Sequence, residues 1–454
     1  MANPLPAVLN LKAEEVDTPE KRGKYTVSVV GCGQRGISYV IAFVEVGFKV
    51  SCIDADQSVI KRLSRGNTLL GNREIESKLK GAVKKGQLTA TSEFKNTIAH
   101  SDIIILTISP KIDANKNPDY SKTQSTCKLI GAALSRGSLV VYGGVAGFGF
   151  TEGIVKETLE NTSGLKVGED FGLAYNPIQD VMALGAKLGS QELRVATIDK
   201  SSLNSAAVIF ETIAKKGVKK IADVKTAELA TLFGAAKRDV NIALANELAV
   251  FCENAGVDYN ETLRLINGDS GEKTVVPTIA EEENGVEAYL LFESAENLNA
   301  KLRLPTLARQ VNEEMVRHAV NLTQDALRSR DKTLRRARIA LLGTIKSGTG
   351  VAAFMELLET KGAKISRYDP QGSENELIDL AHSLKKTFNE TVEGTDCVVV
   401  LTGEDQLKRL NLKKLKAVMK PSAAFVDLAG VVEPREVEAE GFTYRGLGRG
   451  IRKK

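Results

Sequence analysis

The chain has 454 residues, 43% of them hydrophobic and 26% charged, a composition that is typical of globular proteins and argues against a disordered chain. Its 62 basic and 57 acidic residues leave a net charge of only +5, which gives no indication of a nucleic-acid partner. Five scattered cysteines, three isolated histidines and the lack of a long apolar run argue against disulfides, a metal site and a membrane span, so we expect a cytoplasmic protein of two or three domains.

The N-terminal part of the chain is predicted to be an extension followed by an α/β domain. Residues 1–24 contain three prolines and no hydrophobic periodicity. From Tyr25 onward, short β-branched runs alternate with helical stretches, which is typical of a parallel sheet with helices on both faces. The runs that we expect to form strands are 27–30, 49–53, 102–106, 138–142 and 171–175. We place this domain at residues 25–200.

The middle of the chain, residues 201–335, is predicted to be a helical domain because the strand signal fades there. Residues 226–256 form a long helix candidate that ends at Gly256, a residue that commonly terminates helices. Its apolar positions lie on nearly all sides, so we expect it to be buried between partners. Those partners are either a second copy of the chain in a homodimer or the other domains of the same chain.

The last part, residues 336–454, is predicted to be a second and smaller α/β domain. The alternation of strands and helices returns there, with strands expected at 338–343, 362–370, 397–401 and 424–428. The chain ends in a basic tail without interleaved aromatic residues, which favours a solvated terminus over nucleic-acid binding. The basic residues of this tail are Arg445, Arg449, Arg452, Lys453 and Lys454.

A G-x-G-x-x-G motif follows the first predicted strand directly and opens a predicted helix. Gly31 allows the tight turn, Gly33 lets the backbone approach a pyrophosphate, and Gly36 lets helix and strand pack closely. The free N–H groups at the start of the helix favour phosphate binding. The alternative is a glycine-rich strand-to-helix turn without a ligand. The remaining residues of the predicted cofactor-binding turn are Cys32, Gln34 and Arg35.

An acidic residue stands where a dinucleotide-binding fold requires one. Asp54 ends the second predicted strand, where a carboxylate can accept hydrogen bonds from the adenosine ribose hydroxyls. A carboxylate at this position repels a 2′-phosphate. The motif therefore predicts NAD, in preference to NADP, as the cofactor.

Six stretches taken in order carry a family resemblance. From about Val27 to Gly430 the chain resembles the UDP-glucose/GDP-mannose dehydrogenase family. The resemblance implies an N-terminal Rossmann-type NAD domain, a dimerising helical middle and a C-terminal Rossmann-like domain that holds the nucleotide of a nucleotide-sugar substrate. It also implies that Ser109 contacts the cofactor. The six stretches are 31–36 with Asp54, 86–94, 101–121, 175–177, 241–258 and 362–370.

The resemblance also implies a reaction, which the residues at the catalytic positions put in question. Members of this family oxidise a sugar CH₂OH group twice with NAD, through a thioester on a cysteine, in polysaccharide biosynthesis. The position of that cysteine falls on Glu283, and the position of the following aspartate falls on Glu287. A carboxylate cannot replace a thiolate in this step. We therefore expect that the double oxidation is not performed in the family's way.

Other catalytic positions of the family also differ. The family's lysine, which can stabilise an oxyanion, and its asparagine are replaced by uncharged Thr231 and Ala235. The family's glutamate falls on Ile178 or Gln179, and its Ser-Thr pair on residues 143–144, both glycine. A lysine of the C-terminal domain is retained as Lys346.

Two functions remain open from the sequence. The first is an NAD-dependent oxidoreductase that acts once on a CH–OH group, with a base recruited from among other residues. The second is a non-catalytic NAD-binding homologue with a regulatory or partner-subunit role, which the combined loss of catalytic residues favours. The residues available as a base are Lys237, Glu247, Asp180 and the glutamates Glu281, Glu282 and Glu283, and the catalytic residue stays unassigned.

Overall fold

The computed structural model of the protein describes residues 8–9, 11–68, 73–177, 188–190, 192–267, 275–279, 285–345, 349–369, 383–385 and 387–450. The chain forms two compact units. The first consists of Met1–Ala235 and Val286–Lys301, and the second of Ala236–Gly285 and Leu302–Lys454. The division into an extension, an NAD-binding domain, a helical middle and a C-terminal domain at the boundaries given above stays a prediction.

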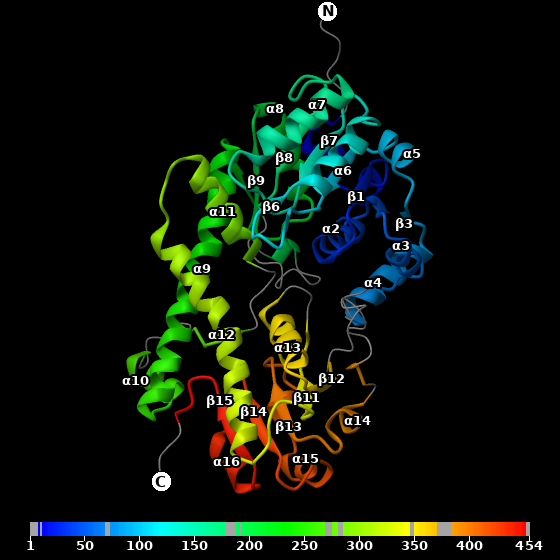
Figure 1. The fold of residues 1–454 in the computed structure, drawn as a ribbon. Coiled ribbons are helices and arrows are strands. Elements are labelled where there is room, and N and C mark those ends of the chain that lie inside the picture. Colours follow the sequence, from blue (N-terminus) through cyan, green and yellow to red (C-terminus); the bar gives the residue numbers. More distant parts are fainter. Residues whose placement is uncertain are drawn as a thin grey trace, which may run out of the picture. The chain divides into compact units, whose positions relative to one another are not determined.

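The first unit is built on an eight-stranded sheet in the order β10-β9-β8-β7-β4-β1-β2-β3. Figure 1 labels its strands β1, β3, β7, β8 and β9. Neighbouring strands are parallel except for the antiparallel pair β8 and β9. The five predicted strands are confirmed. The sequence patterns missed three short strands, β3, β9 and β10. The strands are β1 (Thr26–Val30), β2 (Lys49–Ile53), β3 (Leu88–Thr91), β4 (Ile103–Leu106), β7 (Leu139–Tyr142), β8 (Gly172–Tyr175), β9 (Leu193–Thr197) and β10 (Val218–Ile221).

Helices cover both faces of this sheet, as predicted. Alternate residues of one strand point to opposite cores: Val29 packs on the side of α2, whereas Val30 packs on the side of α6. Both side chains are fully buried, which explains the continuous apolar runs of the central strands. One face carries α2 (Gln34–Glu45), α4 (Arg73–Lys84) and α8 (Lys200–Glu211), and the other α5 (Phe94–Ala99), α6 (Ser121–Gly131) and α7 (Glu157–Ser163).

The described part of the predicted N-terminal extension packs into the core of the first unit. Val8, Leu11 and Val16 are buried in the same apolar cluster as α2. The Arg22 guanidinium donates a hydrogen bond to the carbonyl oxygen of Val16 at 2.6 Å and another to Val46 at the end of α2 at 3.0 Å. This segment, which includes α1 (Pro19–Arg22), therefore stabilises the sheet domain.

The second unit contains a five-stranded parallel sheet in the order β12-β11-β13-β14-β15. The four predicted strands are confirmed, and β15 was missed. One face packs against α12 (Arg303–Arg328) and α13 (Gly350–Thr360), and the other against α14 (Phe388–Val392), α15 (Leu412–Val418) and α16 (Pro434–Ala439). The strands are β11 (Arg338–Leu342), β12 (Lys364–Tyr368), β13 (Cys397–Val400), β14 (Ala424–Asp427) and β15 (Thr443–Gly446).

The predicted long helix is confirmed as α9 (Val224–Ala255), which ends at Gly256 with a φ of +72°. Its second half packs against α12 through buried polar side chains. The Asn312 amide nitrogen donates to the Asp239 carboxylate at 2.7 Å, and the Asn246 amide nitrogen donates to the Asn312 amide oxygen at 3.0 Å. These bonds satisfy groups that would otherwise be costly to bury. None of the described helices is both long and apolar enough for a membrane crossing.

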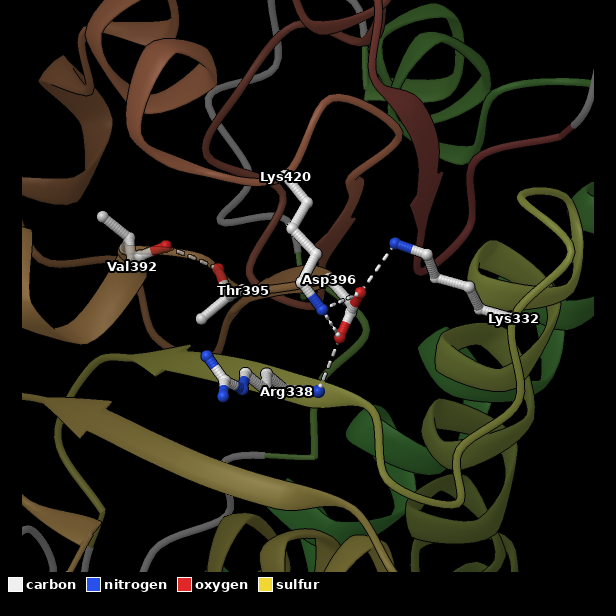
Figure 2. A network of polar contacts seen from close by, with 6 residues as sticks. All are labelled: Lys332, Arg338, Val392, Thr395, Asp396 and Lys420. Carbon is white, nitrogen blue, oxygen red and sulfur yellow. Dashed lines mark hydrogen bonds and ion pairs between the residues drawn. The ribbon is translucent and has the colours of Figure 1, made fainter.

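A buried carboxylate joins the amino ends of the strands in the second unit (Figure 2). Asp396 accepts hydrogen bonds from the Lys332 ammonium at 2.6 Å, the Lys420 ammonium at 2.8 Å and the Arg338 backbone N–H at 2.9 Å. Burial opposes its ionisation, but the Arg338 N–H and the two lysines hold the Asp396 pKa below its ordinary value. Since ligands of such sheets bind at the carboxyl ends of the strands, this network has a structural role.

The expectation of a solvated basic tail is wrong for Arg449, which is 9% exposed. Its guanidinium forms an ion pair with Asp258, and the backbone N–H of Gly448 donates to the Glu253 carboxylate at 2.8 Å. The reason is the missed strand β15, which leads the chain onto α9 and α10 (Tyr259–Asn267). Residues 452–454 lie outside the described part of the chain.

Candidate functional site

The glycine turn after β1 has the geometry that close approach of a ligand requires. Gly31 has a φ of +93°, and a side chain there would lie 2.9 Å from Thr107 and Ile108. A Cβ atom on Gly36 would lie 2.0 Å from the carbonyl oxygen of Gly31, so α2 and β1 pack too closely for any other residue. By contrast, a Cβ atom on Gly33 would meet nothing within 4 Å. The backbone at Gly33, which caps the start of α2, is therefore open to the approach of a ligand, as a pyrophosphate site needs.

Asp54 lies beside this turn at the end of β2. Its carboxylate accepts a hydrogen bond from the Cys32 backbone N–H at 2.8 Å and another from the Asp56 backbone N–H at 3.0 Å. These two bonds orient the carboxylate and leave further lone pairs to accept bonds from hydroxyl groups. The predicted residues Gly31, Gly33 and Asp54 are thus brought together at the carboxyl ends of β1 and β2, and they fit the adenosine and pyrophosphate part of NAD.

Cys32 contributes its backbone to the turn, because its side chain points into the core. The thiol is 5% exposed and lies 3.6 Å from the carbonyl oxygen of Ile53. Its hydrogen bond with Cys52, followed by burial, raises the Cys32 pKa well above its ordinary value. Burial raises the pKa of the Cys127 thiol to about 12. Both thiols are therefore protonated at neutral pH. A nucleophilic cysteine must instead be ionised to the thiolate.

Arg35 and Ser109 meet at the other half of the site. The Arg35 guanidinium donates to the Ser109 hydroxyl at 3.0 Å, and the same hydroxyl accepts from the Val145 backbone N–H at 3.0 Å. A second nitrogen of Arg35 lies 4.0 Å from a carboxylate oxygen of Glu287 on α11 (Val286–Asn297). The two charged side chains are 10% and 19% exposed. The sequence marked Arg35 and Glu287 separately, but nothing in it indicated that they meet.

Three fully buried tyrosines, Tyr39, Tyr142 and Tyr175, lie close enough to Arg35 for its charge to influence their pKa values. The Tyr142 hydroxyl donates to the carbonyl oxygen of Val145 at 2.6 Å, the Tyr39 hydroxyl donates to the side-chain oxygen of Asn176, and the Tyr175 hydroxyl lies 3.4 Å from the Thr231 hydroxyl. Burial raises the pKa of each phenol. These hydroxyls are therefore neutral, internally bonded donors, and they are not available as bases at neutral pH.

The tyrosines explain the two glycines at the family's Ser-Thr position. A Cβ atom on Gly143 would lie 2.6 Å from the Tyr39 hydroxyl oxygen, and one on Gly144 would lie 2.6 Å from the Tyr142 hydroxyl oxygen. The aromatic side chains thus occupy the space that any side chain at 143 or 144 would need. A serine or threonine cannot be restored there without displacing a tyrosine.

The position of the family's lysine also has a structural role in this chain. Thr231 on α9 is 5% exposed, and its hydroxyl lies 3.2 Å from the carbonyl oxygen of Ala227, one turn earlier. This helical bond and the contact with Tyr175 use the hydroxyl within the fold. The position of the family's asparagine, Ala235, is partly exposed and carries no polar group. The described residues at these positions therefore bring no charge to the site.

Of the candidate bases named from the sequence, the structure describes two. Lys237 and Glu247 are exposed residues of α9 that belong to the second unit. Several other expected residues lie outside the described part of the chain. These are Ile178, Gln179, Asp180, Glu281, Glu282, Glu283 and Lys346.

Glu228 on α9 is a functional-site neighbour that sequence reasoning missed. Its fully buried carboxylate accepts hydrogen bonds from the backbone N–H groups of Gly149 at 2.7 Å and Thr151 at 2.8 Å. These hydrogen bonds hold residues 149–151, which follow Gly143 and Gly144 along the chain, against α9. Burial outweighs the two bonds and raises the Glu228 pKa to about 7. An acidic residue on a nearly all-round apolar helix was the signal that could have revealed it.

The second unit has its own turn at the carboxyl ends of its strands. Gly343 follows β11 with a φ of +132°, and the Thr344 hydroxyl lies 2.9 Å from the Asp369 carboxylate at the end of β12. A pocket of about 280 Å³ lies at the start of α13. It combines the side chains of Arg309 and Arg317 with the N-terminus of a helix, where anions are favoured. Glu313 also lines it, and Arg309 forms ion pairs with Asp239 at 3.2 Å and with Glu313 at 3.8 Å. Its lining includes Arg309, Asn312, Arg317, Thr349 and Gly350.

Comparison with protein-family models gives three consecutive matches to one family. Residues 25–180 match the NAD binding domain of the UDP-glucose/GDP-mannose dehydrogenase family, residues 225–314 match its central domain, and residues 348–434 match its UDP binding domain. The three matches follow the order of the two sheets and the long helix between them.

Individual proteins are similar along nearly the whole chain. The UDP-N-acetyl-D-mannosamine dehydrogenase of Pyrococcus horikoshii is 27% identical over 435 residues, which cover 93% of this chain and 99% of that protein. The UDP-glucose 6-dehydrogenase of Rhizobium meliloti is 25% identical, with coverage of 93% and 99%. Among solved structures, the UDP-D-ManNAc dehydrogenase of Pyrococcus horikoshii is similar with a TM-score of 0.80, 26% identity and coverage of 94% and 100%. The NDP-N-acetyl-D-galactosaminuronic acid dehydrogenase of Methanosarcina mazei has a TM-score of 0.71, 27% identity and coverage of 96% and 98%.

Proposed function

Since the chain belongs to the UDP-glucose/GDP-mannose dehydrogenase family, we propose that it is an NAD-dependent oxidoreductase acting on a CH–OH group of a nucleotide sugar, in polysaccharide biosynthesis. The observation that carries this proposal is the intact glycine turn with Asp54 held beside it. A turn that served only to connect strand and helix would not need an open Gly33 together with an oriented carboxylate.

The residues that hold NAD in this proposal lie on the first unit. The N–H groups at the start of α2 bind the pyrophosphate, and Asp54 accepts the hydroxyls of the adenosine ribose. Bound NAD supplies the acceptor for the hydride of the alcohol carbon. The role of the protein is to orient the alcohol, to remove its hydroxyl proton and to exclude water.

The nucleotide of the substrate is assigned to the second unit. The pocket at the start of α13 is lined by Arg317 and by Arg309, which is paired with Asp239 and Glu313, and the match to the UDP binding domain covers this helix. A diphosphate carries the charge that two guanidinium groups and a helix N-terminus favour. We expect UDP alone to bind there, because the nucleotide makes these contacts without the sugar.

The geometry supports one oxidation per substrate molecule. The positions of the family's lysine and Ser-Thr pair are occupied by Thr231, Gly143 and Gly144, which the fold uses for packing. The five cysteines are all buried, so none offers an accessible thiol for a thioester. We expect one NADH for each substrate oxidised and a carbonyl product.

A second candidate function is a non-catalytic NAD-binding homologue with a regulatory or partner-subunit role. The observation that favours it is the same loss of charge at position 231, because alcohol oxidation needs a group that stabilises the developing oxyanion. In this alternative NAD binds, but no sugar is turned over.

An assay of NADH formation separates the two candidates. The purified protein is incubated with NAD and a panel of UDP- and GDP-sugars, while NADH absorbance and product mass are followed. We expect a carbonyl product from one or more sugars in the panel and an at least tenfold weaker affinity for NAD in Asp54→Ala. Asp56→Ala, two residues further on, is the matched control.

The outcomes are distinct. NAD binding without turnover of any sugar supports the non-catalytic candidate, and formation of a uronic acid contradicts the single oxidation. If Asp54→Ala binds NAD as tightly as the unmodified protein, the assignment of the cofactor site is wrong.

We also propose a homodimer built on α9. Leu244, Leu248 and Phe251 are 57%, 44% and 68% exposed, and their spacing of four and three residues places them on one face of the helix. The end of α10 adds Leu265 and Ile266, which are 86% and 72% exposed. Apolar surface of this kind marks a site of association, and the same face on a second copy can cover it symmetrically.

A further inference from the structure

A buried cation stands inside the glycine motif. Arg35 is the fifth residue of G-x-G-x-x-G and lies in the first turn of α2, with only 10% of its side chain exposed. Two of its nitrogens have identified oxygen neighbours: the Ser109 hydroxyl at 3.0 Å and the Glu287 carboxylate at 4.0 Å. A guanidinium that is kept from water needs such acceptors. The side chain is therefore held in a defined direction.

The strand order shows which part of a dinucleotide this cation faces. β1 has β2 on one side and β4 on the other, so the strand order reverses direction at β1. A dinucleotide lies across the carboxyl ends of the strands at such a point. Asp54 marks the adenosine half at the end of β2. The nicotinamide half therefore lies over β4 and β7, where Ser109 and Val145 bind each other.

Arg35 and Glu287 reach this second half from two elements. Arg35 comes from α2 and Glu287 from the start of α11, and one nitrogen of Arg35 lies 4.0 Å from a carboxylate oxygen of Glu287. Both side chains are largely buried, at 10% and 19% exposure, and charges interact more strongly in such surroundings than in water. A change in the charge of a ligand near Arg35 and Glu287 therefore changes its interaction energy with both side chains.

The nicotinamide ring changes charge during the reaction. It is cationic in NAD⁺ and neutral in NADH. A fixed guanidinium nearby opposes the cationic ring, and a fixed carboxylate favours it. We propose that Arg35 and Glu287 form an opposed charge pair that sets the ratio of the affinities for NAD⁺ and NADH. This inference rests on the proposed NAD site, and it assigns the pair a role in selecting the redox state of the cofactor.

Calorimetric binding of three ligands tests the pair without turnover. NAD⁺, NADH and ADP-ribose, which lacks the nicotinamide, are titrated into the unmodified protein and into Arg35→Met and Glu287→Gln. Arg35→Met leaves the carboxylate alone, and we expect the ratio Kd(NAD⁺)/Kd(NADH) to fall by about tenfold. Glu287→Gln leaves the guanidinium alone, and the ratio should rise by about tenfold. The matched control is Glu296→Gln, an exposed carboxylate on the same helix.

The proposal is overturned if the ratio Kd(NAD⁺)/Kd(NADH) is unchanged in both variants while both still bind ADP-ribose like the unmodified protein. The pair then has a structural role only. Failure of the unmodified protein to bind any of the three ligands instead removes the NAD site itself, and is recognised because ADP-ribose also fails. If Arg35→Met does not fold, the partly exposed Glu287→Gln decides alone: a raised ratio supports the proposal and an unchanged ratio overturns it.

Discussion

At the scale of single residues, Glu228 is a carboxylate whose pKa is changed by burial in the folded protein. Its carboxylate is fully buried and accepts two backbone hydrogen bonds from the segment after Gly143 and Gly144. Burial raises its pKa from 4.5 in the unfolded chain to about 7. A group whose pKa is raised by folding holds its proton more tightly in the native state. Deprotonation above pH 4.5 therefore favours the unfolded chain.

We predict that the protein loses stability through Glu228 as the pH rises from about 4.5 to about 7. The full loss is on the order of 3 kcal/mol, because one unit of pKa corresponds to about 1.4 kcal/mol. Glu228→Gln cannot ionise and should show a flatter dependence of the free energy of unfolding on pH, measured by urea denaturation. Glu157→Gln, an exposed residue of α7, is the control. Equal pH slopes for the unmodified protein and Glu228→Gln would contradict the prediction.

The residues predicted from the sequence and those missed differ in one physical respect. Gly31, Gly33 and Asp54 belong to a local motif in which the spacing along the chain determines the geometry. The contacts Arg35–Glu287 and Glu228–Gly149 join segments far apart in the chain. No periodicity reports such a contact, because it exists only after α9 and α11 have packed against the sheet.

At the scale of elements, the strong patterns were reliable and the weak ones were not. Helix α9 was predicted within two residues at its start and at its end, since Gly256 stops it. The strands β3 and β10 were missed because Leu88–Thr91 and Val218–Ile221 are short and contain polar residues. Edge strands of a sheet are buried less and so need fewer apolar residues.

The exposed apolar face of α9 leads to a prediction about association. Leu248→Glu combined with Phe251→Glu should convert a dimer into a monomer, because the two new carboxylates would have to be buried in the interface. The molecular mass in sedimentation equilibrium should fall by half. The control is Leu129→Glu on α6, because Leu129 is 50% exposed, which lies between the exposures of Leu248 and Phe251. A monomeric unmodified protein, or a double variant that stays dimeric, would show that this face is not the interface.

At the scale of the whole molecule, we predict that NAD and UDP protect different residues from hydrogen exchange, because their proposed sites lie on different units. NAD should protect the backbone amides of residues 33–36, at the start of α2, from hydrogen exchange, because phosphate oxygens accept their hydrogen bonds. UDP should protect the amides at the start of α13, next to the pocket with Arg309 and Arg317. Exchange is followed by mass spectrometry with each ligand alone.

Asp54→Ala provides the internal control for this experiment. The variant should lose the protection by NAD and keep the protection by UDP, since Asp54 belongs to the first unit and the pocket to the second. Protection of residues 33–36 by UDP alone would contradict the assignment of the two sites.

The class of fold, the nucleotide turn and the family can all be inferred without the structure, because strands, helices and phosphate-binding turns depend on residues that are close along the chain. The sequence contains five scattered cysteines, and the structure shows that all five are buried. Three features could be seen only in the folded protein: the tyrosines that require Gly143 and Gly144, the hydrogen-bonded Thr231, and the contact of Arg35 with Glu287. These features depend on which side chains share a volume, and that is settled only when distant segments pack together.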